Sequence, residues 1–251
     1  MSPITISVIA LACVFGGALL GIFLHTSLPQ HHLAADSKDI VKLGMGLVGT
    51  MSALVLGLLV ASAKGSYDAQ STELTHMSAN IAVLDRVLAH YGPESKEARD
   101  LLRGAVARIL DQMWSKDGTG ASSEAPSFAG GEILYDKIQR LSPKSDMQHS
   151  LQTQALSIGM DIGKTRWLMF EQATTSVSMP LLVVLVLWLT VIFISFGLFA
   201  PFNATVVASL FVAALSVSGA IFLILEMYGP YSGLIQISSA PLRAALAQLG
   251  Q

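Results

Sequence analysis

Residues 43–63 read LGMGLVGTMSALVLGLLVASA, an apolar stretch with no charged residue between Lys42 and Lys64. A hydrocarbon core about 30 Å thick is crossed by roughly 20 helical residues, which is about the length of this stretch. Because unpaired backbone polar groups are costly in lipid, the stretch is expected to be a membrane-spanning α-helix. Three further charge-free stretches of similar length are Ile4–Leu24, Leu181–Phe199 and Ala204–Leu225.

The four stretches predict an all-α integral membrane protein, with four transmembrane helices in two hairpins that flank a polar, helical middle. We expect no strand anywhere in the chain. The predicted divisions are a first transmembrane hairpin at 1–66, a helical cytoplasmic domain at 67–178, a second transmembrane hairpin at 179–227, and a cytoplasmic tail with a short amphipathic helix at 228–251.

The composition of the chain excludes several classes of function. Charged residues make up 13% of the chain, against about a quarter in soluble domains, and the deficit lies in the four stretches. A net charge of -2 and the lack of a basic tract give no reason to expect a nucleic-acid partner. The single cysteine, Cys13, excludes an intrachain disulfide and is expected to be a buried, inert thiol. No nucleotide-binding loop, nucleophile elbow or zinc-protease motif occurs, so we expect neither an enzyme nor a cofactor.

In the polar middle of the chain, apolar residues have the spacing that is typical of helices packed against one another. Its first seam alternates steps of three and four residues and follows the second apolar stretch without a breaker. This pattern predicts one helix that leaves the membrane and ends at Gly92-Pro93. A second amphipathic helix is expected near 98–113, and a long one over 145–175. The residues of the first seam are Leu74, Met77, Ile81, Leu84, Leu88 and Tyr91.

The basic residues predict an orientation. Most of the 15 Lys and Arg residues lie within 64–178, whereas only Lys38 and Lys42 lie in the link between the first two stretches. Under the positive-inside rule, the middle domain and both termini are expected in the cytoplasm.

Small residues mark one stripe of the second apolar stretch, with a lysine near each end. Such a stripe serves either tight helix–helix packing or the lining of an aqueous path between the two membrane edges. In the first stretch, Gly17 and Gly21 have the Gly-x-x-x-Gly spacing that allows close helix approach. The candidate pore-lining residues are Lys42, Gly46, Gly49, Ala53, Gly57 and Lys64.

Two other ionisable features have alternative interpretations. Glu226, at the end of the last apolar stretch, either reaches the headgroups or pairs with a base or faces water. The link after the first stretch holds His31, His32 and Asp36, which are weak candidates for a metal site. The alternatives for this link are a solvated surface and a pH-sensitive group.

Long segments of the chain resemble the bestrophin-like family of bacterial membrane proteins, formerly catalogued as a domain of unknown function. The segments that carry this resemblance are DSKDIVKLGMGLVGTMSALVLGLLVASAKGSYD (36–68), VLAHYGPESKEARDLLR (87–103), FGLFAPFNATVVASLFVAALSVSGAIFLILEM (196–227) and GLIQISSAPLR (233–243).

The resemblance implies a function. Bestrophins are pentameric anion channels whose second membrane helix lines a pore on the symmetry axis. By this likeness we expect a homo-oligomeric, pentameric ion channel in the bacterial inner membrane that conducts an anion such as chloride. The chain departs from animal bestrophins in one respect, because its second apolar stretch contains no Phe. The alternative is a non-conducting membrane scaffold or sensor that signals through its cytoplasmic helices.

Overall fold

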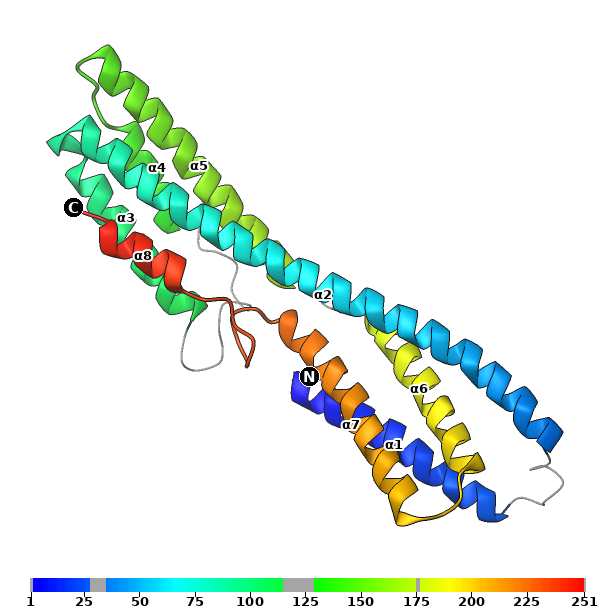
Figure 1. The fold of residues 1–251 in the computed structure, drawn as a ribbon. Helices are drawn as coiled ribbons and strands as arrows, with labels where there is room; N and C mark the ends of the chain where they lie inside the picture. Colours follow the sequence, from blue (N-terminus) through cyan, green and yellow to red (C-terminus); the bar gives the residue numbers. More distant parts are fainter. Residues whose placement is uncertain (1, 28–34, 115–128, 175–176, 251) are drawn as a thin grey trace. The chain divides into compact units, whose positions relative to one another are not determined.

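The computed structural model describes residues 2–27, 35–114, 129–174 and 177–250. These residues form helices and no strand, which confirms the predicted all-α class (Figure 1). The elements in chain order are α1 (Pro3–Ser27), α2 (Ala35–Tyr91), the 3-10 turn η2 (Pro93–Ser95), α3 (Lys96–Met113), α4 (Ala129–Gln139), α5 (Asp146–Thr174), α6 (Met179–Phe199), α7 (Ala204–Met227) and α8 (Ala240–Gln248).

Four helices are long and apolar enough to cross a membrane. They are α1, α6, α7 and the part of α2 that starts at Lys38, so each predicted apolar stretch lies within one of them. Helix α6 has Pro180 in its first turn, where a missing backbone N–H is tolerated. Helix α7 is capped by Asn203, whose side-chain Oδ1 accepts a hydrogen bond from the Val206 backbone N–H at 2.8 Å.

The chain divides into two compact units. The membrane unit comprises Met1–Gly65 and Ser176–Tyr228, and the helical unit comprises Ser66–Thr175 and Gly229–Gln251. Helix α2 continues without a break from Gly65 to Ser66, so it contributes residues to both units (Figure 1).

In the membrane unit, α1 and α6 approach so closely that only glycine fits at their crossing. A Cβ atom at Gly21 would overlap the carbonyl oxygen of Ile194, and one at Gly197 would overlap the carbonyl oxygen of Ala18. A Cβ atom at Gly17 would lie 2.9 Å from Thr190 Cγ2. The Gly-x-x-x-Gly spacing of α1 therefore serves close approach within one chain, with a partner glycine on α6.

The core of the membrane unit joins α2 to α6 and α7. Leu59 and Ala63 of α2 pack with Leu185 of α6 and with Ile221 and Ile224 of α7. All five side chains are at most 3% exposed, so this end of the membrane part of α2 is fixed against its own chain.

The expectation that Cys13 is buried is wrong. The thiol is free and exposed on the surface of α1. The buried face of α1 follows the spacing of Ala10, Val14 and Ala18, and Cys13 lies off that face.

In the helical unit, the predicted seam of α2 forms the core. The six seam side chains are at most 2% exposed and pack with Leu102 of α3 and with Ala155 and Met169 of α5. The helix ends at Tyr91, as predicted, because Gly92 adopts a φ of 123° that side chains other than glycine rarely accept.

The residues after α7 are attached to the helical unit by hydrogen bonds. The Trp114 Nε1–H donates to the carbonyl oxygen of Ile237 at 3.0 Å, and the Tyr67 hydroxyl donates to that of Gln236 at 3.2 Å. Helix α8 buries Leu242, and Leu249 just after it is also buried. The predicted C-terminal helix is thus confirmed, with one face packed in the core.

A buried ion pair joins α2, α3 and the C-terminal end. Arg99 donates from Nε and Nη2 to the two carboxylate oxygens of Asp85, both at 2.8 Å, and Asp85 is 2% exposed. The backbone N–H of Gly250 donates to the same carboxylate at 3.4 Å. Burial alone raises the pKa of Asp85, but the hydrogen bonds from Arg99 and Gly250 and the charges of Arg99 and Arg86 outweigh it. The pKa therefore lies below its ordinary value.

Candidate functional site: the membrane part of α2

The membrane part of α2 contacts its own chain along one narrow face. Ser52, Leu59 and Ala63 are buried on this face, and Gly49 and Val55 are half-buried beside it. The Ser52 hydroxyl donates to the carbonyl oxygen of Val48 at 2.8 Å, so burial leaves this polar group paired. The rest of the circumference is uncovered by the chain itself.

One uncovered side is bulky and aliphatic. We call it the aliphatic face, and it comprises Leu43, Leu47, Met51, Leu54 and Leu58. Leu43 and Leu54 are 78% and 71% exposed in the single chain. A continuous apolar surface of this kind needs lipid or another protein surface against it.

The other uncovered side is the predicted stripe of small residues. The aliphatic face and the stripe flank the covered face on its two sides. Gly46, Ala53 and Gly57 are exposed in the single chain, and only Gly49 is half-buried. Lys42 and Lys64 are exposed near its two ends.

The glycines of this stripe make no close contact with another described helix of the chain. A Cβ atom at Gly46 or Gly57 would meet no described atom within 4 Å, and one at Gly49 would meet only Ile192 Cδ1 at 4.0 Å. This differs sharply from Gly21 of α1, where the backbone of α6 leaves no room. Of the two interpretations of the stripe, packing therefore needs a helix other than the described helices of the same chain, and the aqueous path remains an alternative.

Lys42 and Lys38, near the start of α2, each interact with another side chain. Lys42 Nζ lies 3.7 Å from a carboxylate oxygen of Asp39, one turn earlier, and both side chains are largely exposed. Such a pair contributes little stability and only partly offsets the positive charge. Lys38 Nζ lies over the Phe199 ring, 5.8 Å from its centroid, which is the geometry of a cation–π contact.

Glu226 lies inside the membrane unit. Its side chain is 6% exposed in the single chain, at the end of α7. A carboxylate with so little exposed surface does not extend freely toward the headgroups, so the interpretation as a buried, partnered group is favoured.

The weak metal candidates belong to the link between α1 and α2. His31 and His32 lie outside the described residues, as does the side chain of Asp36. Among the described residues, no group of three or more His, Cys, Asp or Glu side chains has the arrangement of a metal site. His25, at the start of the same link, forms a hydrogen bond from Nδ1 to the carbonyl oxygen of Leu198 at 2.7 Å.

The helical unit holds a buried polar cluster that the sequence interpretation missed. Gln172 Nε2 donates to Glu73 Oε1 at 2.7 Å, and Gln70 is 1% exposed. Burial, together with the charge of Glu73, raises the pKa of Tyr231. Gln70 lies four residues before the seam residue Leu74 and so continues the spacing of the seam. A polar residue at a seam position was therefore the sequence signal for a buried polar cluster. The buried polar atoms that lack a hydrogen-bond partner among the described residues include Gln70 Oε1, Glu73 Oε2, Gln172 Oε1 and the Tyr231 hydroxyl.

Replacing Tyr231 by phenylalanine is expected to keep or slightly raise stability, by up to about 1 kcal/mol. The change removes a buried hydroxyl without a partner, while the ring keeps its edge-on contact with Trp114, at 5.6 Å between centroids. Denaturant unfolding in detergent, followed by circular dichroism, measures the difference. As a control, Trp114→Phe loses the hydrogen bond to Ile237 and is expected to destabilise by about 1 kcal/mol. Equal destabilisation by the two variants would contradict the prediction.

Four membrane-type helices, together with a second helical unit built around the continuation of α2, define a helical integral membrane protein. Within that class, the chain belongs to the bestrophin-like family, because the family model of the bestrophin-like domain matches residues 12–242. Neither the comparison with curated proteins nor that with solved structures gave a significant match. The family assignment made from the sequence is thus confirmed.

Proposed function

We propose that this protein is an oligomeric ion channel, not an enzyme, with its pore on the symmetry axis and lined by the stripe of α2. The observation that carries the proposal is the open side of α2, where small residues run the length of a membrane helix. Gly46, Ala53 and Gly57 are exposed in the single chain, and a Cβ atom at Gly46 or Gly57 would meet no described atom within 4 Å. Bestrophin-like membership supports the same function. Closed symmetric rings bring one such stripe from each copy to a common axis, and the family suggests five copies.

The rest of the α2 surface fits this arrangement. The aliphatic face of α2 supplies an apolar surface for a neighbouring copy or for lipid, while the smaller stripe leaves room at the axis. The α1–α6 crossing needs no second copy, because its close contacts lie within one chain.

Anions are the proposed permeating ions, and chloride is the simplest case. Lys42 and Lys64 stand near the two ends of the stripe, and rings of positive side chains favour anions in a pore. The proposed location is the bacterial inner membrane, with both termini in the cytoplasm, as the basic residues favour.

Gly46→Leu is expected to abolish chloride flux through protein reconstituted in liposomes, because five leucines at one level would obstruct the axis. Gly44→Leu is the matched control. Both glycines are exposed and have open space around them in the single chain, yet they lie two residues and about 200° apart around the helix. The control is expected to conduct.

The assay includes potassium flux and the mass of the assembled particle. Loss of flux in Gly46→Leu with an intact ring supports the proposal. If flux is lost because the ring dissociates, the stripe serves packing between copies, and the proposal of a pore lined by this stripe is overturned. A wild-type protein that passes neither ion, at several pH values and calcium concentrations, would also overturn it.

The second candidate function is a non-conducting scaffold or sensor. It is favoured by the continuity of α2, which links the core of the membrane unit to the core of the helical unit through one helix. A dimer without flux, rather than a ring, would favour this alternative.

A further inference from the structure

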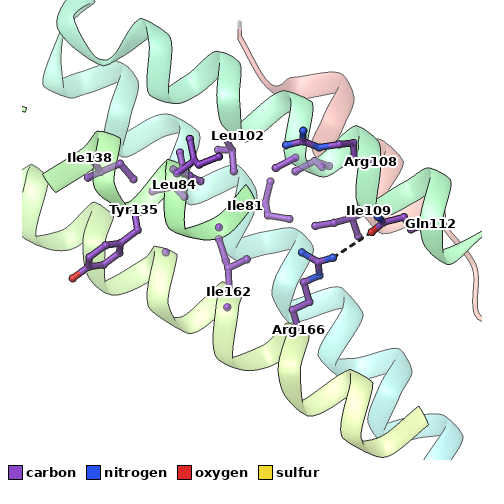
Figure 2. A pocket seen from close by; sticks show the side chains of 17 residues that line it. Ile81, Leu84, Leu102, Arg108, Ile109, Gln112, Tyr135, Ile138, Ile162 and Arg166 are labelled. Atoms are coloured by element: carbon purple, nitrogen blue, oxygen red, sulfur yellow. Dashed lines mark hydrogen bonds between the residues drawn. The ribbon is translucent and has the colours of Figure 1, made fainter. Parts of the chain in front are cut away.

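The helical unit contains a cavity of about 300 Å³, partly open to solvent, between α2, α3, α4 and α5 (Figure 2). Its volume falls at the lower end of the roughly 300–1,000 Å³ found for small-molecule sites. The wall is mostly aliphatic, so an occupant would present an apolar body to it. The principal apolar lining residues are Ile81, Leu84, Leu102, Ile109, Ile138 and Ile162.

Glycines help to keep this cavity open. Gly131 of α4 and Gly159 and Gly163 of α5 line it. A Cβ atom at any of the three would meet no described atom within 4 Å. The glycines of α5 stand one turn apart on a helix, where glycine costs about 1 kcal/mol relative to alanine. Gly131 and Gly163 are exposed, so the cavity opens to solvent beside them, and a large side chain at these positions would obstruct it.

Two arginines provide the charge of the cavity. Arg108 of α3 and Arg166 of α5 both line it, and Arg166 Nη2 donates to Gln112 Oε1 at 3.3 Å (Figure 2). Neither arginine forms an ion pair with an acidic side chain of the described residues. Burial, and then the like charge of Arg108, lowers the pKa of Arg166, although a guanidinium stays charged. Two neighbouring cations beside an apolar cavity are complementary to one anionic group.

We propose that this cavity binds an anionic amphiphile: a medium-length fatty acid, with its chain among the aliphatic residues and its carboxylate between Arg108 and Arg166. Guanidinium groups bind carboxylates through paired, charge-assisted hydrogen bonds. The site lies wholly in the helical unit, so the inference is independent of whether α2 lines a pore.

The test is equilibrium binding of labelled decanoate to the full chain in lipid nanodiscs, with empty nanodiscs of the same lipid subtracted. Decanol, which has the same chain without the charge, is the matched ligand. Saturable binding of decanoate, at least tenfold tighter than that of decanol, is expected. No saturable binding above empty nanodiscs, or equal affinity for both ligands, would overturn the proposal.

Two variants locate the site. Gly163→Leu fills the cavity and is expected to abolish binding, whereas Gly104→Leu, on an exposed part of α3 outside the lining, is expected to leave it unchanged. Arg166→Gln is expected to weaken decanoate binding about tenfold and to leave decanol unaffected, since one charge-assisted contact is lost. Folding of each variant is verified by its helical circular dichroism and melting temperature. Equal binding by folded Gly163→Leu and Gly104→Leu would place the ligand elsewhere and reject the site.

Discussion

Replacing Arg99 by methionine is expected to lower the free energy of unfolding by about 3–5 kcal/mol. The Asp85 carboxylate is 2% exposed and receives both hydrogen bonds of a bidentate pair from Arg99. Removing only the cation leaves a buried charge with the weak contact from Gly250 as its remaining partner. Denaturant unfolding in detergent, followed by circular dichroism, measures the loss.

Two control variants test whether the unpaired charge of Asp85 causes the loss of stability in Arg99→Met. Lys137→Met removes an exposed pair with Glu97, at 2.7 Å, and is expected to cost less than about 1 kcal/mol. The double variant Asp85→Leu with Arg99→Met removes both charges and is expected to recover most of the stability lost by Arg99→Met alone. If the exposed and buried pairs cost the same, the buried charge is not the source of the effect.

The ion pair also predicts a dependence on pH. The pKa of Asp85 in the folded protein lies below its ordinary value, so its ionised form is stabilised by folding. Its contribution is fully present above the unfolded pKa and is lost as the pH falls through the lower, folded pKa. Acid unfolding of the wild type should therefore steepen below about pH 4. The double variant should lack the part of the pH dependence that comes from Asp85. If its acid unfolding profile equals that of the wild type, Asp85 is not the source of this pH dependence.

Replacing Gly21 by alanine is expected to destabilise the membrane unit by about 3 kcal/mol or more. The added Cβ would overlap the carbonyl oxygen of Ile194, which is backbone, so no side-chain rotation relieves the overlap. The two helices must separate, and they lose contacts along the whole α1–α6 crossing. The expected result is a lower melting temperature in detergent and a lower yield of monodisperse protein.

Gly16→Ala is the matched control for this substitution. Gly16 lies on the same helix, and a Cβ there would meet no described atom within 4 Å, so stability should be unchanged or slightly increased. Gly197→Ala, on the other side of the crossing, should reproduce the defect of Gly21→Ala, since its Cβ would overlap the Ala18 carbonyl oxygen. Normal melting of both crossing variants would show that the helices do not meet as described.

Several features of the fold could be predicted from the sequence because they depend on short segments. The length of an apolar stretch relative to the bilayer sets the four membrane-type helices. The alternating spacing from Leu74 to Tyr91 identified the buried face of α2, because helical geometry brings those residues to one side. The end of α2 followed from Gly92-Pro93, where Gly92 adopts a positive φ that other residues rarely accept.

The membrane class, the helices and the seam of the helical unit could thus be predicted from the residues alone, since these follow from apolar length and periodicity. How two similar motifs are used depends on the packing of the folded chain. A Cβ atom at Gly21 would meet backbone of α6, whereas one at Gly46 would meet no described atom within 4 Å, although both glycines lie in stretches of the same character. The pairing of Asp85 with Arg99 and the cavity beside Arg166 were likewise decided by packing. The physical reason is that partners across helices are set by three-dimensional contacts, which no local pattern encodes.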